Sequence, residues 1–415
     1  MIITDGNYKN ALAAIRALGK SGVFSTVCSD SIAIAFFSKY CRTRYIYTSP
    51  KYPNSFLRDI YDLVKKRKKN VLMPIGAETT VLISSVKKRL SQFVKVSAPD
   101  YTILEKAHDK FSCINIAKTV GVPVPQTILF TKVSDLKKII SKVSFPVVIK
   151  ANRGVGVFKG VRYAYSPRDL LYKCREVQNQ PSYSNMVWDF QKLLIQEYIP
   201  GEIRDVVALF NNGTPRAAVV QRRVITYPPE GGVGIVNETI NDRNLLNLAI
   251  KILKRLRWHG VAQVEFKLDS DNIPRLMEVN PKFWGTLELA IASGVNFPYL
   301  LYTMVMEGDV KPTFSYRKNL QMWWVNAGFI RFIPSLKNTR ARNRLLSEIF
   351  DLHKKKCIDF HFSDIGSSLV QFIMLNLKPM ISDIYRRQHK ILEYPRSPIN
   401  LIDISYKSNN KPKVT

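Results

Sequence analysis

The stretch that decides the fold reads GVAQVEFKLDSDNIPRLMEVNPKFWGTLELAIASG and runs from Gly260 to Gly294. Residues 262–268 alternate between apolar and polar side chains, which is the pattern of a strand with one buried face. A turn-forming run, Asp269–Asn272, follows, and then a second strand in which Leu276, Glu278 and Asn280 are expected to share a face. The stretch therefore predicts a β-hairpin.

Two carboxylates face each other in this hairpin when its loop covers Ser270–Ile273, because Glu265 then lies opposite Glu278. Like charges in that position repel each other, and a divalent cation removes the conflict. Asn280 adds a neutral oxygen on the same face, and hard oxygen donors suit Mg²⁺. A solvated surface hairpin is the alternative. Three oxygen ligands in register favour a metal–phosphate site, with Glu265, Glu278 and Asn280 as the metal ligands.

The hairpin resembles the metal-binding end of the ATP-grasp enzymes, and within that superfamily it is most similar to the carbamoyl-phosphate-synthase-like proteins. The resemblance rests on Glu265, on the run Glu278-Val279-Asn280-Pro281, and on Gly285 and Gly294. The family pattern usually has an arginine after the proline. This chain has Lys282 there, which keeps the positive charge but loses the bidentate fork. By this resemblance Lys282 is a catalytic candidate.

Composition sets wide bounds on the class of protein. The chain has 415 residues, 46% of them hydrophobic, which is enough for two or three domains with a sizeable core. No run of eighteen apolar residues and no secretory signal pattern occurs, and the five cysteines are scattered, so we expect reduced thiols and a cytoplasmic protein. The net charge of +31 is compatible with nucleic acid, an anionic membrane surface or anionic substrates. No nucleic-acid signature appears, so no specific nucleic acid is expected.

The first hundred residues read as a β–α–β start. An apolar strand ends at Asp5-Gly6, a helical pattern ends near Gly19, and Val23–Cys28 reads as the next strand. This order predicts a parallel, doubly wound sheet, which the resemblance identifies with the preATP-grasp domain, residues 1–100. Glu78 follows another strand, Val71–Ile75, as either a ligand contact or a helix N-terminal acid.

Two lysines are candidate phosphate ligands. Asp100–Val120 reads as one helix that contains Lys110, and a lysine on a polar helix face is usually only solvated. Phe145–Lys150 reads as a strand, and the glycine-bearing loop Arg153–Gly160 follows it. A glycine loop alone is a weak signal. In ATP-grasp chains, however, a base before such a helix and a lysine at such a strand end contact nucleotide phosphate, so the resemblance implies these roles for Lys110 and Lys150.

The run Leu193–Ile199 reads as a buried strand that enters Pro200-Gly201. In ATP-grasp enzymes such a segment is the hinge against which adenine lies. The resemblance therefore implies that Glu197 lies at the adenine amino group, that Ile199 offers its backbone, and that Glu202 accepts hydrogen bonds from the ribose. Glu197 as an edge-strand charge is the alternative.

A hairpin around Asn211-Asn212-Gly213 precedes a pair of arginines. The Pro- and Gly-rich loop Thr226–Gly234 follows, and a loop of this kind beside arginines suits a mobile cover over an anion. Arg223 is therefore a candidate clamp for a phosphate or carboxylate in the catalytic site.

The C-terminal region mixes aromatic and basic residues: Trp323, Trp324, Phe329, Arg331 and Phe332, then Lys337, Arg340, Arg342 and Arg344. Interfacial aromatics beside lysine and arginine are compatible with peripheral attachment to an anionic membrane. A folded core is the favoured alternative, because no amphipathic stripe runs through the stretch.

The resemblance covers about residues 1–310. It implies an α/β fold: a preATP-grasp parallel sheet (1–100), then the two-lobed, α+β ATP-grasp domain (101–310, lid lobe about 125–200), and a mostly helical region of unknown role (311–415). The implied activity is an ATP- and Mg²⁺-dependent ligase, with Mn²⁺ as the alternative cation. It activates a carboxylate as an acyl phosphate for attack by an amine or similar nucleophile. A nucleotide-binding module without ligase activity and a peripheral membrane or surface-assembly protein are the alternatives.

Overall fold

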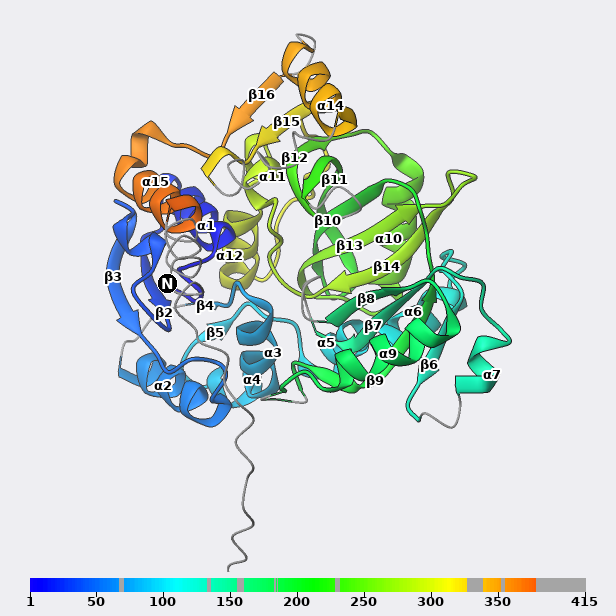
Figure 1. The fold of residues 1–415 in the computed structure, drawn as a ribbon. Helices are drawn as coiled ribbons and strands as arrows, with labels where there is room; N and C mark the ends of the chain where they lie inside the picture. The colour runs from blue at the N-terminus through cyan, green and yellow to red at the C-terminus, as the bar shows by residue number, and fades with distance from the viewer. Residues whose placement is uncertain are drawn as a thin grey trace, which may run out of the picture.

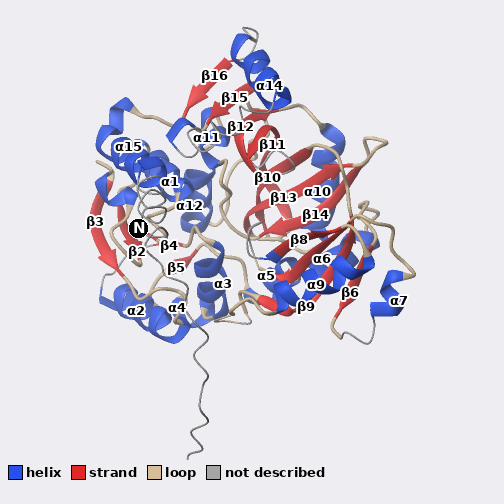
Figure 2. Ribbon diagram, in the orientation of Figure 1, coloured by secondary structure: helices blue, strands red, loops and turns tan. Residues whose placement is uncertain are grey.

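The computed structural model describes residues 1–66, 71–132, 136–154, 160–182, 184, 186–227, 232–326, 339–351 and 355–377. These residues form three sheets with helices packed around them (Figure 1, Figure 2). The mixed α/β fold predicted from the sequence is confirmed. None of the described helices has the length and apolar character that a membrane span requires.

The first sheet is parallel and has five strands in the order β3-β2-β1-β4-β5. The predicted parallel arrangement is therefore confirmed. Its strands are β1 (Ile2–Ile3), β2 (Ser25–Ser29), β3 (Cys41–Ile46), β4 (Val71–Met73) and β5 (Lys95–Val96). Its helices are α1 (Lys9–Lys20), the 3₁₀ helix η1 (Ile34–Phe37), α2 (Pro53–Lys66), α3 (Ala77–Ser85) and α4 (Lys87–Leu90).

The second sheet is antiparallel and has four strands in the order β6-β9-β7-β8. They are β6 (Thr127–Phe130), β7 (Val147–Arg153), β8 (Val161–Ala164) and β9 (Asp189–Glu197), and the helices of this segment are α7 (Leu136–Ile140) and α9 (Pro167–Gln178). Helix α9 packs against β7, β8 and β9. The lysine strand expected from the sequence is β7.

The third sheet has seven strands in the order β14-β13-β10-β11-β12-β15-β16. The strands are β10 (Ile203–Asn211), β11 (Thr214–Tyr227), β12 (Val233–Thr239), β13 (Gly260–Leu268), β14 (Pro274–Asn280), β15 (Leu320–Trp323) and β16 (Lys355–Ile358). All neighbours are antiparallel except β15 and β16. Its last two strands come from the C-terminal region, which thus contributes strands as well as helices.

The remaining helices connect and cover these sheets. They are α5 (Tyr101–His108), α6 (Lys110–Thr119), α10 (Arg243–Arg255), α11 (Leu287–Ala292), α12 (Phe297–Glu307), α14 (Thr339–Phe350), α15 (Ile365–Phe372), the 3₁₀ turn η5 (Phe362–Asp364) and the π-helical turn η6 (Ile373–Leu377). Helix α10 buries its apolar side, including Leu245 and Ile252, against Val206, Val264 and Phe266 of the large sheet. The opposite side of these strands is therefore free to carry polar groups.

One predicted helix is two helices. The sequence pattern over Asp100–Val120 predicts a single helix, but the chain breaks at Asp109, whose backbone is extended (φ −74°, ψ 102°). The Asp109 carboxylate accepts a hydrogen bond from the Ser112 backbone N–H (2.9 Å), which caps α6. Side-chain capping of this kind competes with helix continuation, and it places Lys110 in the first turn of α6.

The C-terminal region docks on the first sheet. Figure 1 shows α15 beside α1, and α15 also contacts η1. Between them lies a buried ionic cluster in which Arg16 donates to Asp364 Oδ2 (2.9 Å), Ser367 Oγ (2.9 Å) and Ser368 Oγ (2.8 Å). The N-terminal sheet and the C-terminal region are thus joined through this Arg16 cluster.

The tryptophan pair proposed for membrane contact is buried at β15. Trp323 is 8% exposed and Trp324 is 1% exposed, and the Trp324 indole N–H donates to Asn237 Oδ1 (2.9 Å). The burial agrees with the folded-core alternative. Phe329, Arg331, Phe332 and Lys337 lie outside the described residues, as do the side chains of Arg340 and Arg344.

Candidate functional site

The hairpin of β13 and β14 places the expected carboxylates opposite each other. Glu265 pairs with Glu278, and Gln263 pairs with Asn280, so the predicted register is confirmed at these positions. The route to this register differs from the expectation. Strand β14 starts at Pro274 opposite Leu268, which makes the loop one residue longer, and a bulge between Glu265 and Phe266 compensates for the shift.

The bulge changes which side chain of β14 faces which way. The alternation in the sequence predicts Leu276 on the same face as Glu278, but Leu276 lies in the core with Phe266. Met277 and Glu278 both line the pocket instead. The bulge adds one residue to one strand of the pair, and this extra residue reverses the alternation on that side.

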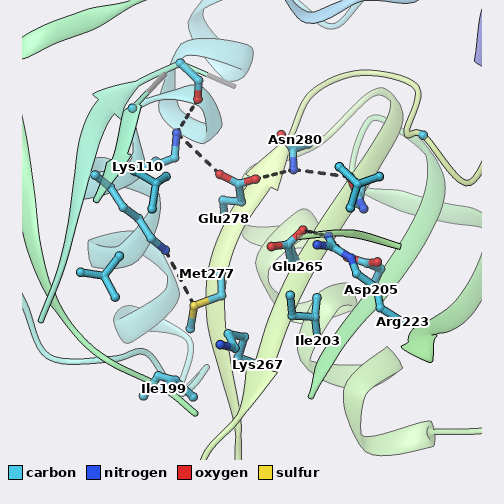
Figure 3. Close-up of a pocket in the computed structure, with 18 of the residues that line it drawn as sticks. Lys110, Ile199, Ile203, Asp205, Arg223, Glu265, Lys267, Met277, Glu278 and Asn280 are labelled. Atoms are coloured by element: carbon cyan, nitrogen blue, oxygen red, sulfur yellow. Dashed lines mark hydrogen bonds and ion pairs between the residues drawn. The ribbon is translucent and has the colours of Figure 1, made fainter. Parts of the chain in front are cut away.

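The pocket lies between the second and third sheets and has a volume of about 350 Å³. Figure 3 shows Glu278 between Lys110 and Asn280, with Glu265 beside Arg223. Lys110 Nζ is 3.6 Å from Glu278 Oε2 and also donates to the Gly154 carbonyl oxygen (2.6 Å). The Asn280 amide donates to Glu278 Oε1 (2.8 Å). The three predicted metal ligands therefore lie together on one wall.

Lysines set the charge of Glu278. Burial opposes its ionisation, but Lys110, Lys150 and the Asn280 hydrogen bond, with Lys282 just beyond the end of β14, outweigh that cost and lower the pKa of Glu278. Burial in turn lowers the pKa of Lys150 to about 8, against the pull of Glu278 and Glu265. The Lys150 ammonium contacts the Met277 thioether (3.9 Å). The strand lysine and the hairpin carboxylates thus face each other across the pocket.

The hinge segment forms another wall. Glu197 and Ile199, for which the family resemblance implies adenine contacts, both line the pocket. Glu197 is exposed and accepts a hydrogen bond from the Gln126 backbone N–H (3.0 Å). Gln196, which sequence reasoning missed, also lines the pocket and is 1% exposed.

Glu202 does not lie among the residues that line this pocket. It forms ion pairs with Arg204 (2.8 Å) and Arg222 (3.4 Å) on the other face of β10 and β11. Ile203 and Asp205 carry the pocket-facing positions of β10. The reason is the period of a strand, since Glu202 and Arg204 alternate with Ile203 and Asp205.

Asp205 is a second residue that sequence reasoning missed. It is 1% exposed, lies opposite Glu265 on the neighbouring strand and lines the pocket. No described residue makes a hydrogen bond of normal geometry to either of its oxygens, and Arg223 Nη2 is 3.7 Å from Oδ1. Burial raises the pKa of Asp205 to about 7 although Arg223 opposes the shift. An acid in the largely apolar run Ile203–Phe210 is unusual, but the run itself does not show that Asp205 lies in a pocket.

Arg223 is held by the acids around it. Its guanidinium forms an ion pair with Glu265 and donates to the Gly232 carbonyl oxygen (3.2 Å). Burial disfavours its charge, but Glu265 and Asp205 raise the pKa of Arg223. The arginine therefore lies beside Glu265, one of the expected metal ligands. The loop that was expected to cover it falls partly on residues 228–231, and the glycine loop on residues 155–159, which lie outside the described residues.

The far end of the pocket carries Lys282 and a further lysine, Lys9 of α1. The Lys9 ammonium lies over the Trp324 ring, 3.5 Å from its centroid. Burial lowers the pKa of Lys9 to about 8 and also lowers that of Lys282. Sequence reasoning missed Lys9, because nothing in a helix-start lysine marks it for a site formed by residues distant in the sequence.

The donor set fits a metal-bound polyphosphate. Two carboxylates and an amide oxygen are hard donors in register, and the buried Asp205 oxygens without donors add acceptor capacity beside them. Lys110 and Lys150 supply positive charge on the facing side, and Lys282 supplies it at the far end of the pocket. A nucleoside triphosphate with its cation matches both the oxygen donors and the lysines, because the cation binds the oxygens and the phosphates face the ammonium groups.

Comparisons with known proteins agree with this geometry. Residues 189–327 match the family model described as ATP-grasp in the biosynthetic pathway with Ter operon. The chain is 25% identical over 271 residues to a pyruvate carboxylase subunit from Methanothermobacter thermautotrophicus, covering 62% of this chain and 54% of the relative. It is 22% identical over 315 residues to the arginine-specific carbamoyl phosphate synthase large chain of Neurospora crassa, covering 71% and 25%. The chain thus spans about half or less of these curated relatives.

Among solved structures, the chain resembles biotin carboxylase from Campylobacter jejuni. The TM-score is 0.64 at 17% identity, and the match covers 77% of this chain and 74% of that chain. A match at this level of identity shows similarity of fold. Together with the family match, it shows that the chain carries an ATP-grasp domain and has the ATP-grasp fold.

Proposed function

We propose that this protein is an ATP- and Mg²⁺-dependent ligase that activates a carboxylate as an acyl phosphate and passes the acyl group to an amine or a similar nucleophile. One observation carries the proposal. Glu265 and Glu278, in register on the hairpin, face Lys110 and Lys150 within one pocket. Opposed carboxylates and lysines at this spacing suit the metal and the phosphate groups of one bound nucleotide.

The chemistry is two displacements. An oxygen of the substrate carboxylate attacks the γ-phosphorus of ATP, the bond to the bridging oxygen breaks, and ADP leaves. The nucleophile then attacks the carbonyl carbon of the acyl phosphate, loses a proton, and inorganic phosphate departs. Lys110 and Lys150 hold the charge of the phosphate oxygens as the phosphoryl group moves. Lys282 and Arg223, at the other end of the pocket, are the catalytic candidates that orient the acid.

The metal ligands in this proposal are Glu265, Glu278 and Asn280. A bound Mg²⁺ supplies charge neutralisation to the phosphate groups, and Mn²⁺, with the same preference for oxygen, is the alternative cation. Glu265 and Glu278 would hold the cation in place of their present ion pairs with Arg223 and Lys110, and the two basic side chains would then be available to the phosphates.

The adenine end of the site lies at the hinge. Ile199 offers backbone groups and Glu197 lies beside them at the pocket edge. We assign no ribose contact to Glu202, because its ion pairs with Arg204 and Arg222 hold it on the other face of the sheet. Residues from the first two expected segments, 1–100 and 101–310, line this pocket, and the third, 311–415, contributes Trp324 beneath Lys9.

The metal site is tested with Glu278→Gln, with Glu307→Gln as the matched control. Glu307 is exposed on α12 and does not line the pocket. We expect the first change to weaken Mg·ATP binding by about tenfold or more in calorimetry, because a cation loses a charged ligand, and the control to leave it unchanged. Equal binding and equal ADP release in both variants would remove Glu278 from the metal site.

The acyl phosphate is tested with hydroxylamine. An ADP-release screen over carboxylates and amines identifies a productive pair, and we expect the acid with ATP and hydroxylamine to give a hydroxamate when the amine is omitted. Formation of AMP and pyrophosphate instead would show adenylate chemistry. ATP binding without substrate-dependent ADP release would favour the nucleotide-binding module.

A further inference from the structure

A second cavity adjoins the nucleotide pocket. It has a volume of about 410 Å³ and shares four residues with that pocket: Lys9, Trp188, Lys282 and Gly285. Its other walls come from the first turns of α1 and α3, from Val187 and from Leu375 of the C-terminal region. A molecule in this cavity would therefore touch the phosphate end of the nucleotide pocket at one side and the first sheet's helices at the other.

Two cations stand at the border of the two cavities. Lys9 and Lys282 are both partly buried, and neither forms an ion pair or hydrogen bond with another residue in the described part of the chain. The carboxylates that raise the pKa of Lys9 are Asp359 and Glu288, and those that raise the pKa of Lys282 include Glu278 and Glu265. The Trp324 ring packs against the Lys9 ammonium, and the indole N–H of Trp324 donates a hydrogen bond to Asn237, which holds the ring in place. Partly buried ammonium groups without acceptors indicate an anionic ligand.

The other side of the cavity offers acceptors. Glu78 lines it and is placed by the Trp188 indole N–H, which donates to Glu78 Oε1 (3.2 Å). Asn7 also lines it, and its amide nitrogen donates to Ser29 Oγ (3.2 Å) and Ser31 Oγ (2.9 Å). These bonds leave Asn7 Oδ1 as a buried acceptor to which no described residue donates. A carboxylate and a free amide oxygen suit a ligand group that donates hydrogen bonds and carries positive charge.

We propose that this second cavity binds the acid substrate, and that the substrate is an amino acid whose carboxylate lies between Lys9 and Lys282 and whose ammonium group faces Glu78 and Asn7. This assignment rests on the proposed ligase function and names the substrate class for the same site. The carboxylate then stands at the border with the nucleotide pocket, where it meets the γ-phosphate. Lys9 binds the substrate from a part of the chain distant from the ATP-grasp motifs.

The test uses matched acids as probes. Glycine, alanine, aspartate and glutamate are compared with acetate, propionate, succinate and glutarate, which lack only the amino group. Each acid is titrated in a calorimeter into the full chain saturated with Mg·ADP. We expect at least one amino acid to bind about tenfold or more tightly than its deaminated counterpart. If no amino acid binds, or if the deaminated acids bind as well, the amino-acid assignment is overturned.

Two variants locate the binding groups, with Lys20→Gln as the control at the exposed end of the same helix. Lys9→Gln is expected to weaken binding of the amino acid by about tenfold or more, while the affinity for Mg·ADP changes by less than about threefold. Glu78→Gln is expected to bring the amino acid and its deaminated counterpart to similar affinity. Equal acid binding in Lys9→Gln and Lys20→Gln overturns the role of Lys9.

Failure of the proposed function gives a different pattern. In that case the chain does not bind Mg·ADP or Mg·ATP, or Glu278→Gln leaves nucleotide binding intact. Failure of the inference alone leaves nucleotide binding dependent on Glu278 while the acids show no dependence on Lys9 or Glu78. The two outcomes are read from separate titrations of the same preparations.

Discussion

Two buried aspartates, one in the Arg16 cluster and one in the nucleotide pocket, have opposite surroundings. Asp364 is 4% exposed and accepts hydrogen bonds from Arg16 (2.9 Å), Ser38 Oγ (2.8 Å) and the Lys39 backbone N–H (2.9 Å), and a further one from Ser367. Burial disfavours its charge, but these bonds outweigh that cost and lower the pKa of Asp364. Asp205 is 1% exposed and receives no hydrogen bond of normal geometry from the described residues. Burial raises its pKa to about 7, although Arg223 and the Gln263 side chain oppose the shift.

The difference separates structural from functional polar groups. A buried carboxylate that accepts four hydrogen bonds has no capacity left for a ligand, so its role is to join the elements that donate to it. A buried carboxylate without donors costs stability and persists where a ligand completes it. Burial and charge alone do not distinguish the two aspartates. Only the set of donors around each one does.

The largest expected effect is on the completed cluster. Asp364→Asn leaves the buried Arg16 with Glu288, 3.9 Å away, as its remaining charge partner, and we expect the free energy of unfolding to fall by roughly 3 kcal/mol. The measurement is urea denaturation, with Asp30→Asn, at an exposed position directly after β2, as the control. A loss below about 1 kcal/mol would mean that the Arg16 cluster does not join α15 to α1, and the comparison would fail.

The pocket aspartate should behave in the opposite way. Its pKa of about 7 in the folded chain lies above the ordinary value of 3.8. Between these values the unfolded chain releases the proton and the folded chain keeps it, so stability falls as pH rises from about 4 to about 7. We expect Asp205→Asn to remove a slope on the order of 2 kcal/mol between pH 5 and pH 8 in urea denaturation. Parallel pH curves for the two proteins would contradict the raised pKa.

The smallest expected effect concerns Lys150, whose ammonium contacts the Met277 thioether across the pocket. Lys150→Ala is expected to weaken the binding of ATP by about tenfold and that of adenosine by much less, because the lysine contacts the phosphate groups and not the base. Lys192→Ala, an exposed position on β9, is the control. Equal losses for ATP and adenosine would place Lys150 away from the phosphates.

Hydrophobic periodicity and turn-forming residues predicted most of the structure that residues close in the sequence form. The pairing of Glu265 with Glu278 followed from alternation and one turn, because a hairpin's register depends on few residues. The helix break at Asp109 was missed, since a single capping side chain decides it against the surrounding helical pattern. Lys9 and Asp205 were missed for another reason. Their role depends on strands and helices from distant parts of the chain meeting at one pocket, which no local pattern encodes.

Because of the bulge in the hairpin, the orientation of the ligands on β14 depends more on the number of residues in the strand than on which side chain stands at the bulge. Met277 is the extra residue that turns Glu278 and Asn280 toward the pocket while Leu276 stays in the core. Many apolar side chains could stand at position 277 without altering that geometry. Loss of one residue there would rotate both ligands to the core side, and gain of one would do the same from the other direction. In evolutionary terms, position 277 should accept apolar substitutions readily, whereas the strand as a whole should reject insertions and deletions.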